Sequence, residues 1–181
     1  MESWPEWGKP YQPGLFIILP PQEVRAIVDA QREAYDPLSR SYIGTHITVT
    51  QPFLRTPTES EWEQCVEVLG SFQSFEICYG PLKSFLPYPC IWYEVQPAEL
   101  VLELRRTLHQ TGLFNLKEGY IEEFIPHMTI TEGLSGPEVT QALLAQLQSE
   151  SQPGSFLCDQ LVLSVPDQDF RFSPFRTISL I

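Results

Sequence analysis

Two short segments share one pattern: residues 46–50 read HITVT, and residues 127–131 read HMTIT. Both fit H-x-T-h-T, in which h is an apolar residue. The chain has only three histidines, so two such matches have a chance probability on the order of 10⁻⁴ from composition, about tenfold more if the strand preference of threonine is allowed for. The repeated pattern therefore decides how the rest of the chain is interpreted.

Each segment is expected to be a strand with one polar face. Residues i, i+2 and i+4 of a strand point to the same side. The histidine and both threonines of each segment then share a face, and the apolar residues between them face a core. One such pattern is commonly just a solvated strand face. Two together favour a shared functional site.

The sequence around the segments repeats as well. Each is followed by a turn that contains proline (Pro57, Pro137), an amphipathic helix, and a strand that opens with phenylalanine (Phe75, Phe156) at the same distance from its histidine. Two similar halves of this size suggest a pseudo-twofold α+β fold, because a solenoid needs more repeats.

Secondary-structure propensities, with the residues that start and stop helices, predict the other elements of the chain. Two prolines open a first helix that Pro37 should stop, and Thr58 with Glu61 fits a capping box. The expected strands are 11–19, 42–50, 75–86, 91–96, 124–131, 156–165 and 172–181, and the expected helices are 20–35, 58–72, 98–113 and 137–149. No segment has the composition of a linker, so we expect residues 1–181 to form a single domain of two intertwined lobes.

Composition narrows the class of protein. With 181 residues, of which 43% are hydrophobic, the chain can bury a substantial core, which excludes a disordered protein. The net charge of -12 argues against binding of long nucleic acid, because cationic side chains would have to neutralise many phosphates. The apolar run 15–19 is too short for a membrane span or a signal peptide. We therefore expect no membrane partner.

The four cysteines show no C-x-x-C spacing, which argues against a zinc or thioredoxin-like site. We expect reduced core thiols and a cytoplasmic protein. A bridge between Cys78 and Cys90 across a hairpin is the alternative.

Two imidazoles and two threonine hydroxyls suit displacement at a phosphodiester. One imidazole can accept a proton from the nucleophile while the other donates one to the leaving oxygen. Threonine hydroxyls can hold the non-bridging oxygens. The rival interpretation is a metal site that joins both histidines to Glu122, Glu123 or Glu132, but the spacing of known metal motifs is absent. We therefore expect no metal and no cofactor.

The motifs resemble those of the two-histidine phosphoesterase superfamily, which includes bacterial 2′-5′ RNA ligases, cyclic nucleotide phosphodiesterases and ADP-ribose cyclic-phosphate phosphodiesterases. Residues 124–130 (FIPHMTI) are similar to the family's F-x-P-H-h-T-h, and residues 46–48 followed by 52–53 (PF) are similar to its first motif. Thr45 departs from the proline or basic residue that often stands there.

The resemblance implies a bilobal fold, with two antiparallel sheets flanking a central cleft and helices on the outside. It places both motifs on central strands that face this metal-free cleft. It also implies catalytic roles for His46, Thr48, His127 and Thr129. Within the pair, we assign His46 as the acid and His127 as the base.

Other pocket residues come from the positions of charged and aromatic side chains. Arg40 and Arg55 flank the first motif and could bind the anion, or they are solvated surface residues. Tyr93, with Tyr88 and Trp92, could form a platform for a base, or belong to an aromatic core.

Charges near the histidines would also shift their pKa values. Glu122 or Glu123 would raise the pKa of His127, and Arg40 would lower that of His46. His109 lacks the following threonines, and we interpret it as a surface residue.

The function expected from the sequence is a metal-independent phosphodiesterase. It would act on a 2′,3′-cyclic or 1″,2″-cyclic phosphate, or on a 2′-5′ linkage, of a small nucleotide or RNA end. The alternatives are a non-catalytic nucleotide- or RNA-end-binding module and a 2′-5′ RNA ligase. We expect a monomer that does not bind long nucleic acid.

Overall fold

The computed structural model describes residues 4, 6–117 and 124–181. Its helices are η1 (Glu6–Tyr11, a 3-10 helix), α1 (Gln22–Tyr35), α2 (Pro37–Tyr42), α3 (Glu59–Leu69), α4 (Ala98–His109) and α5 (Gln141–Glu150). Its strands are β1 (Leu15–Ile18), β2 (Ile47–Thr48), β3 (Phe75–Ser84), β4 (Ile91–Gln96), β5 (His127–Thr131), β6 (Gly154–Cys158), β7 (Gln160–Pro166) and β8 (Phe172–Ser179).

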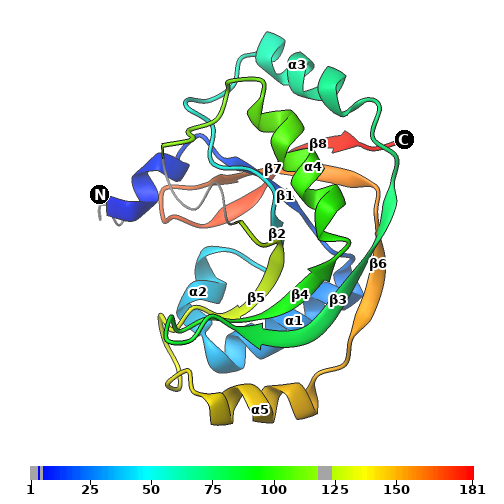
Figure 1. The fold of residues 1–181 in the computed structure, drawn as a ribbon. Coiled ribbons are helices and arrows are strands. Elements are labelled where there is room, and N and C mark those ends of the chain that lie inside the picture. Colours follow the sequence, from blue (N-terminus) through cyan, green and yellow to red (C-terminus); the bar gives the residue numbers. More distant parts are fainter. Residues whose placement is uncertain (1–3, 5, 118–123) are drawn as a thin grey trace.

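The strands form two antiparallel sheets of four strands each, in the orders β2-β1-β7-β8 and β5-β4-β3-β6. Helices lie on the outside of both (Figure 1). This confirms the expected α+β fold of two antiparallel sheets. The two sheets also match in connectivity, because β1-α1-α2-β2 and β4-α4-β5 each join neighbouring antiparallel strands through helix.

The strands that carry the motifs are edge strands, which corrects the expectation of central strands. β2 pairs only with β1, and β5 pairs only with β4. These two edges approach each other between the sheets. Each motif therefore has a hydrogen-bonded neighbour on one side and the other lobe on the opposite side.

The lobes exchange helices. α1 follows β1 of the first sheet but packs against β5 of the second sheet. α4 follows β4 of the second sheet but lies beside α3 in the lobe of the first sheet (Figure 1). One hydrophobic cluster joins the lobes and includes Phe16 on β1 and Tyr93 on β4. The relative position of the two motif strands is consequently fixed by a shared core.

Several element boundaries differ from those expected. Pro37 begins α2 as well as ending α1, because Asp36 caps the new helix by accepting a hydrogen bond from Ser39 N at 3.3 Å. The strand expected over 42–50 is therefore shortened to β2, and η1 occupies the start of 11–19. The capping box of Thr58 and Glu61 on α3 is confirmed.

One expected strand is in fact two. Residues 156–165 lie in β6, which pairs with β3 of the second sheet, and in β7, which pairs with β1 of the first. The chain changes sheets at Asp159, and an alternating pattern does not report which sheet a strand joins.

The remaining expectations concern cysteines, membranes and metals. All four cysteines are free thiols, and three are buried, whereas Cys78 is exposed and is not a core thiol. No helix in the described ranges is long and apolar enough to cross a membrane. Within those same ranges, no cluster of three histidine, cysteine or acidic residues could hold a metal ion.

Candidate active site

The two motif histidines are held in the same way. His46 Nδ1 lies 2.8 Å from the carbonyl oxygen of Gly44, and His127 Nδ1 lies 2.6 Å from that of Ile125. A carbonyl oxygen only accepts, so each Nδ1 carries the proton and donates it. In the neutral ring this leaves the lone pair on Nε2. Both imidazoles are therefore fixed in the tautomer in which Nε2 can accept a proton.

The surroundings of both rings favour the neutral form. Burial, together with the positive charges of Arg32 and of a protonated His127, lowers the pKa of His46 to about 4. Burial also lowers the pKa of His127 below its ordinary value. A charge on His127 thus disfavours a charge on His46, although the two motifs belong to different sheets.

A cavity of about 560 Å³ opens between the sheets. His127 and Thr48 line it, together with Thr50, Arg105 and Glu132 among others. His46 and Thr129 are not among the described lining residues. The structure thus brings one histidine and the threonine of the opposite motif to a single cavity.

Aromatic rings surround His127. Trp92 meets it edge-on with ring centroids 5.4 Å apart, and Phe85 and Phe124 lie at 6.0 Å and 6.4 Å. Phe85 and Phe124 also line the cavity. An apolar wall next to an imidazole excludes water and strengthens the electrostatic interactions of that ring.

The last threonine of each motif has a structural role, although Thr50 also lines the cavity. Thr50 is buried, and its hydroxyl accepts a hydrogen bond from Phe16 N at 3.0 Å. Thr131 is also buried, and its hydroxyl donates to Asp36 Oδ2 at 3.3 Å and accepts from Gly133 N at 3.0 Å. These hydroxyls fix β1, α2 and the turn after β5 around the motifs.

Two buried arginines cross between the lobes. Arg32 on α1 donates to the carbonyl oxygen of Thr129 in the second motif at 2.9 Å. Arg105 on α4 donates to the carbonyl oxygen of Val49 in the first motif at 2.8 Å. Each helix therefore leaves one lobe and holds the motif strand of the other. Sequence analysis missed both arginines.

A signal for them exists in the helical periodicity. On α1 the buried residues are Val24, Val28 and Arg32, and on α4 Arg105 is buried within the apolar stripe. A cation on the apolar face of an amphipathic helix must be desolvated and hydrogen-bonded. This position distinguishes the two arginines from the solvated ones.

The expected anion-binding arginines have other partners. Arg40 Nε lies 3.1 Å from Asp29 Oδ1, and Arg55 forms a two-point ion pair with Glu61 at 2.9 Å and 2.6 Å. Neither lines the cavity in the part of the chain described. Arg32, rather than Arg40, is the cation that lowers the pKa of His46. Glu122 and Glu123 lie outside the described residues.

The expected stacking platform is mostly core. Tyr93 is only 2% exposed, and its hydroxyl donates to Gln31 Oε1 at 3.0 Å, so its ring has no face for a base. Trp92 is buried and stacks on Phe85 with ring centroids 4.9 Å apart. Tyr88, in contrast, is exposed and lines the cavity.

His109 is not a surface residue. It is half-buried on α4, and its Nε2 accepts a hydrogen bond from the main-chain N–H of Gln51 at 3.1 Å. Burial and the neighbouring charge of Arg105 lower its pKa to about 4. Arg105 and His109 thus bind the main chain on both sides of Thr50, at the end of the first motif.

Two facing antiparallel sheets, each with an H-x-T strand at its edge, define the two-histidine phosphoesterase class. The chain belongs to the 2′-5′ RNA ligase superfamily, whose family model matches residues 20–170. The departure at Thr45 does not remove the chain from the family.

Known proteins agree with this assignment. A Bacillus cereus strain B4264 protein named "putative phosphoesterase" is 27% identical over 135 residues, which cover 70% of this chain and 73% of that protein. Escherichia coli LigT complexed with NADP+ has a TM-score of 0.55 and 17% identity, over 92% of this chain and 95% of LigT. The Thermus thermophilus protein TT0787 has a TM-score of 0.60 and 16% identity, over 92% and 96%. At these identities, the two structures share the fold.

Proposed function

We propose that the protein is a metal-independent phosphodiesterase. Its substrate is a small nucleotide or RNA end with a 2′,3′-cyclic or 1″,2″-cyclic phosphate, or with a 2′-5′ linkage. The observation that carries this proposal is the matched pair of imidazoles. Each is anchored through Nδ1 to a carbonyl oxygen, which leaves Nε2 for proton transfer.

The reaction needs one base and one acid. For a cyclic phosphate, one Nε2 takes a proton from water as the water oxygen bonds to phosphorus. The other imidazole, protonated, gives its Nε2 proton to the oxygen whose bond to phosphorus breaks. The product is a phosphomonoester, and the two rings have exchanged protonation states. Hydroxyls of Thr48 and Thr129 donate to the non-bridging oxygens.

The charges revise our assignment of the roles. The guanidinium of Arg32 disfavours a second positive charge on His46, and no such cation acts on His127. When an anionic phosphate attracts one proton to the pair, the proton is more stable on His127. We therefore propose His46 as the base and His127 as the acid for ring opening.

Two further observations support the substrate class over the alternatives. Solved structures of LigT contain NADP+, ATP and 3′-AMP, which are small nucleotides. The net charge of -12 disfavours a ligase that must hold two RNA ends. The free thiols are consistent with a cytoplasmic location, and we propose that the protein acts there as a monomer.

A substrate screen tests the proposal. The wild-type protein is incubated in EDTA with 2′,3′-cyclic nucleotides, a 1″,2″-cyclic phosphate, and a 2′-5′ dinucleotide, with the 3′-5′ dinucleotide as the matched control. We expect a phosphomonoester from at least one of the first three and none from the control. Binding of these nucleotides without turnover would contradict the enzyme and favour the binding module.

A further inference from the structure

A second cavity of about 540 Å³ lies beside the first, along α4. Arg105 and Phe124 line both cavities, so the two share a wall. The rest of its described lining consists of Leu102, Arg106, His109, Gln110 and Leu116. No carboxylate is among these residues, although acidic residues outnumber basic ones by 23 to 11 in the chain. The described lining of the second cavity is thus basic, on a protein that is acidic as a whole.

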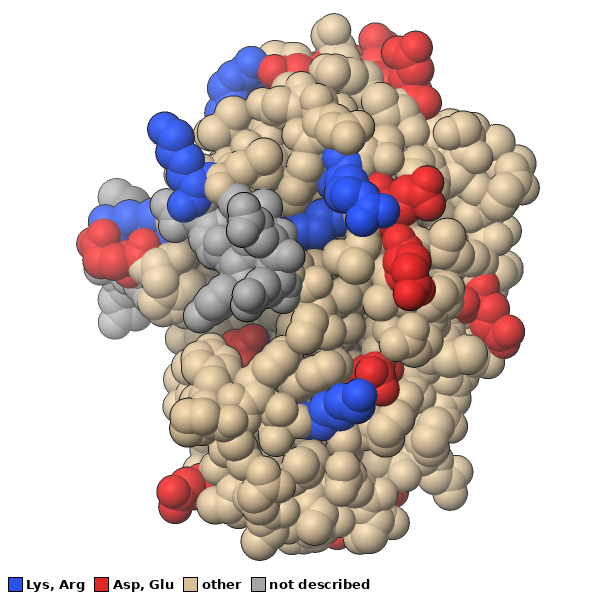
Figure 2. All heavy atoms as spheres, viewed as in Figure 1, with Lys and Arg blue, Asp and Glu red and all other residues tan. Residues whose placement is uncertain are grey.

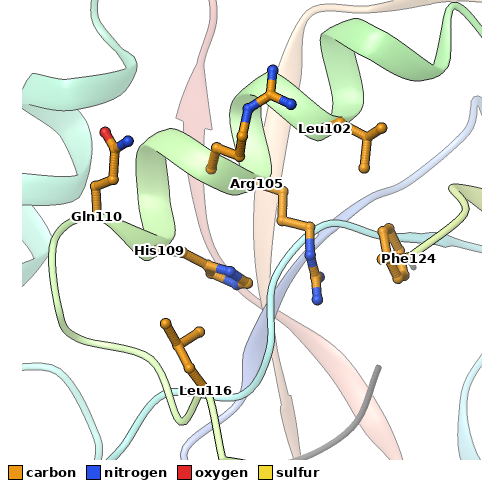
Figure 3. A pocket seen from close by; sticks show the side chains of 7 residues that line it. Leu102, Arg105, His109, Gln110, Leu116 and Phe124 are labelled. Atoms are coloured by element: carbon orange, nitrogen blue, oxygen red, sulfur yellow. The ribbon is translucent and has the colours of Figure 1, made fainter. Parts of the chain in front are cut away.

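Arg105 is the buried cation in the lining of the second cavity. It is 3% exposed, and while Nη1 donates to Val49, Nη2 is buried without a hydrogen-bond partner in the described structure. Its Cζ lies 4.1 Å from the centroid of the Phe124 ring, and Figure 3 shows the guanidinium beside that ring. A guanidinium stacked on a ring keeps its N–H groups in its own plane and its positive charge next to the cavity.

Arg106 is the exposed cation in the lining of the second cavity. It follows Arg105 on α4, and neither arginine forms an ion pair with a described carboxylate. Figure 2 shows basic side chains grouped over α4, with acidic ones to one side. An exposed arginine without an ion pair to a described carboxylate has its N–H groups available to a ligand.

Neutral donors complete the lining. His109 Nε2 accepts from Gln51, so the ring proton is on Nδ1, which is a donor. Figure 3 shows Arg105 and His109 leaving the same side of α4, with Leu116 next to the imidazole. The Gln110 amide adds two more N–H groups. Donors without carboxylates, together with two guanidinium groups, match the oxygens of a phosphate.

We propose that the second cavity binds a second phosphate group of the substrate. The preferred substrate is then a nucleotide with a further phosphate besides the one that reacts, such as a 5′-phosphate on a 2′,3′-cyclic nucleotide. The second-phosphate proposal rests on the proposed function only for the identity of the reacting group. Because the cavities share Arg105, one small molecule can place a phosphate in each.

The test compares two unreactive products, adenosine 2′-monophosphate and adenosine 2′,5′-bisphosphate, by calorimetry. The readout is the ratio of their dissociation constants. Charged hydrogen bonds to one further phosphate should make the bisphosphate bind about tenfold more tightly to the wild type. Arg106→Gln should reduce this ratio below about threefold. Arg171→Gln is the matched control, since Arg171 is exposed and lines neither cavity.

The outcomes separate the two proposals, because neither nucleotide requires turnover. A ratio that Arg106→Gln lowers and Arg171→Gln preserves supports the second phosphate site, whatever the substrate screen yields. Equal affinity of the wild type for both nucleotides overturns it, as does a ratio that Arg106→Gln leaves unchanged. In those cases the phosphodiesterase proposal still stands or fails with the screen alone.

Discussion

Arg32 on α1 donates a hydrogen bond to the carbonyl oxygen of Thr129 on β5, at 2.9 Å. The same guanidinium donates to the carbonyl oxygen of Ile43, just before the first motif, at 3.0 Å. One buried cation therefore holds the main chain of both motifs. Its charge is also one of the causes, after burial, that lower the pKa of His46.

Replacement of Arg32 should separate these two roles. Arg32→Met removes the charge that disfavours protonated His46, so the pKa of His46 should rise. It also leaves buried carbonyl oxygens unpaired, and the free energy of unfolding should fall by about 2 kcal/mol or more. Arg32→Lys keeps the charge, so the pKa of His46 should stay low. NMR titration of the histidine rings measures these shifts.

Arg25→Met on the same helix is the control, since Arg25 is not among the charges that act on His46. An unchanged pKa of His46 in a folded Arg32→Met protein would refute the electrostatic role.

Each motif histidine should be indispensable for turnover. His46→Ala and His127→Ala should each lower kcat by about 10²–10⁴-fold, because each removes one proton-transfer group. Thr48→Val should cost less, because it removes a neutral donor, about tenfold. Circular dichroism controls for folding. A single alanine variant with near wild-type kcat on a substrate of the wild type would contradict the assignment of these residues.

His109 should make stability depend on pH. Its folded pKa of about 4 lies below its ordinary value of 6.5. Between these values the unfolded chain binds a proton that the folded chain does not, so the free energy of unfolding falls as the pH drops from 6.5 towards 4. At pH 8, His109→Leu should cost about 1–3 kcal/mol through the unpaired Gln51 N–H.

The difference in the free energy of unfolding between the wild type and His109→Leu isolates the effect of His109 from that of the carboxylates, which both proteins share. In chemical denaturation, it should shrink as the pH drops through the same range. A difference that stays constant would mean that His109 is not held neutral in the folded protein.

Long nucleic acid should bind weakly. With 11 cationic side chains against 23 acidic ones, the protein can release few counterions from a phosphate backbone. Filter binding of a long structured RNA at physiological salt should give no sub-micromolar affinity. Sub-micromolar binding would revive the RNA ligase alternative.

The sequence predicted the architecture because the doubled motif is a local signal with long-range meaning. H-x-T-h-T marks one strand in each lobe, and the helices between the strands follow from ordinary periodicity and caps such as Thr58. The division of residues 156–165 between two sheets was not predictable, because alternation is identical in either sheet.

The proposed catalytic residues of the candidate site were named from the motifs, whereas its supporting residues were not. Arg40 and Arg55 were chosen for being near His46 in sequence, but proximity along the chain does not bring them to the cavity. Arg32 and Arg105 reach the motifs only because each helix crosses to the other lobe. Such a contact follows from tertiary structure, and only the burial of a cation hints at it.

The most direct test of the central claim is the pH dependence of kcat/KM on a cyclic nucleotide, with EDTA present. Ordinary histidines would place the maximum between about pH 6 and 8. In the free protein burial lowers the pKa of His46 to about 4 and that of His127 below 6.5, so kcat/KM should be a bell with its maximum below neutrality. A bound phosphate anion raises both pKa values, so the bell of kcat should lie at higher pH. The two limbs belong to the coupled pair. A bell in EDTA at acidic pH is the result predicted. Loss of activity in EDTA that a divalent ion restores would contradict the two-histidine account.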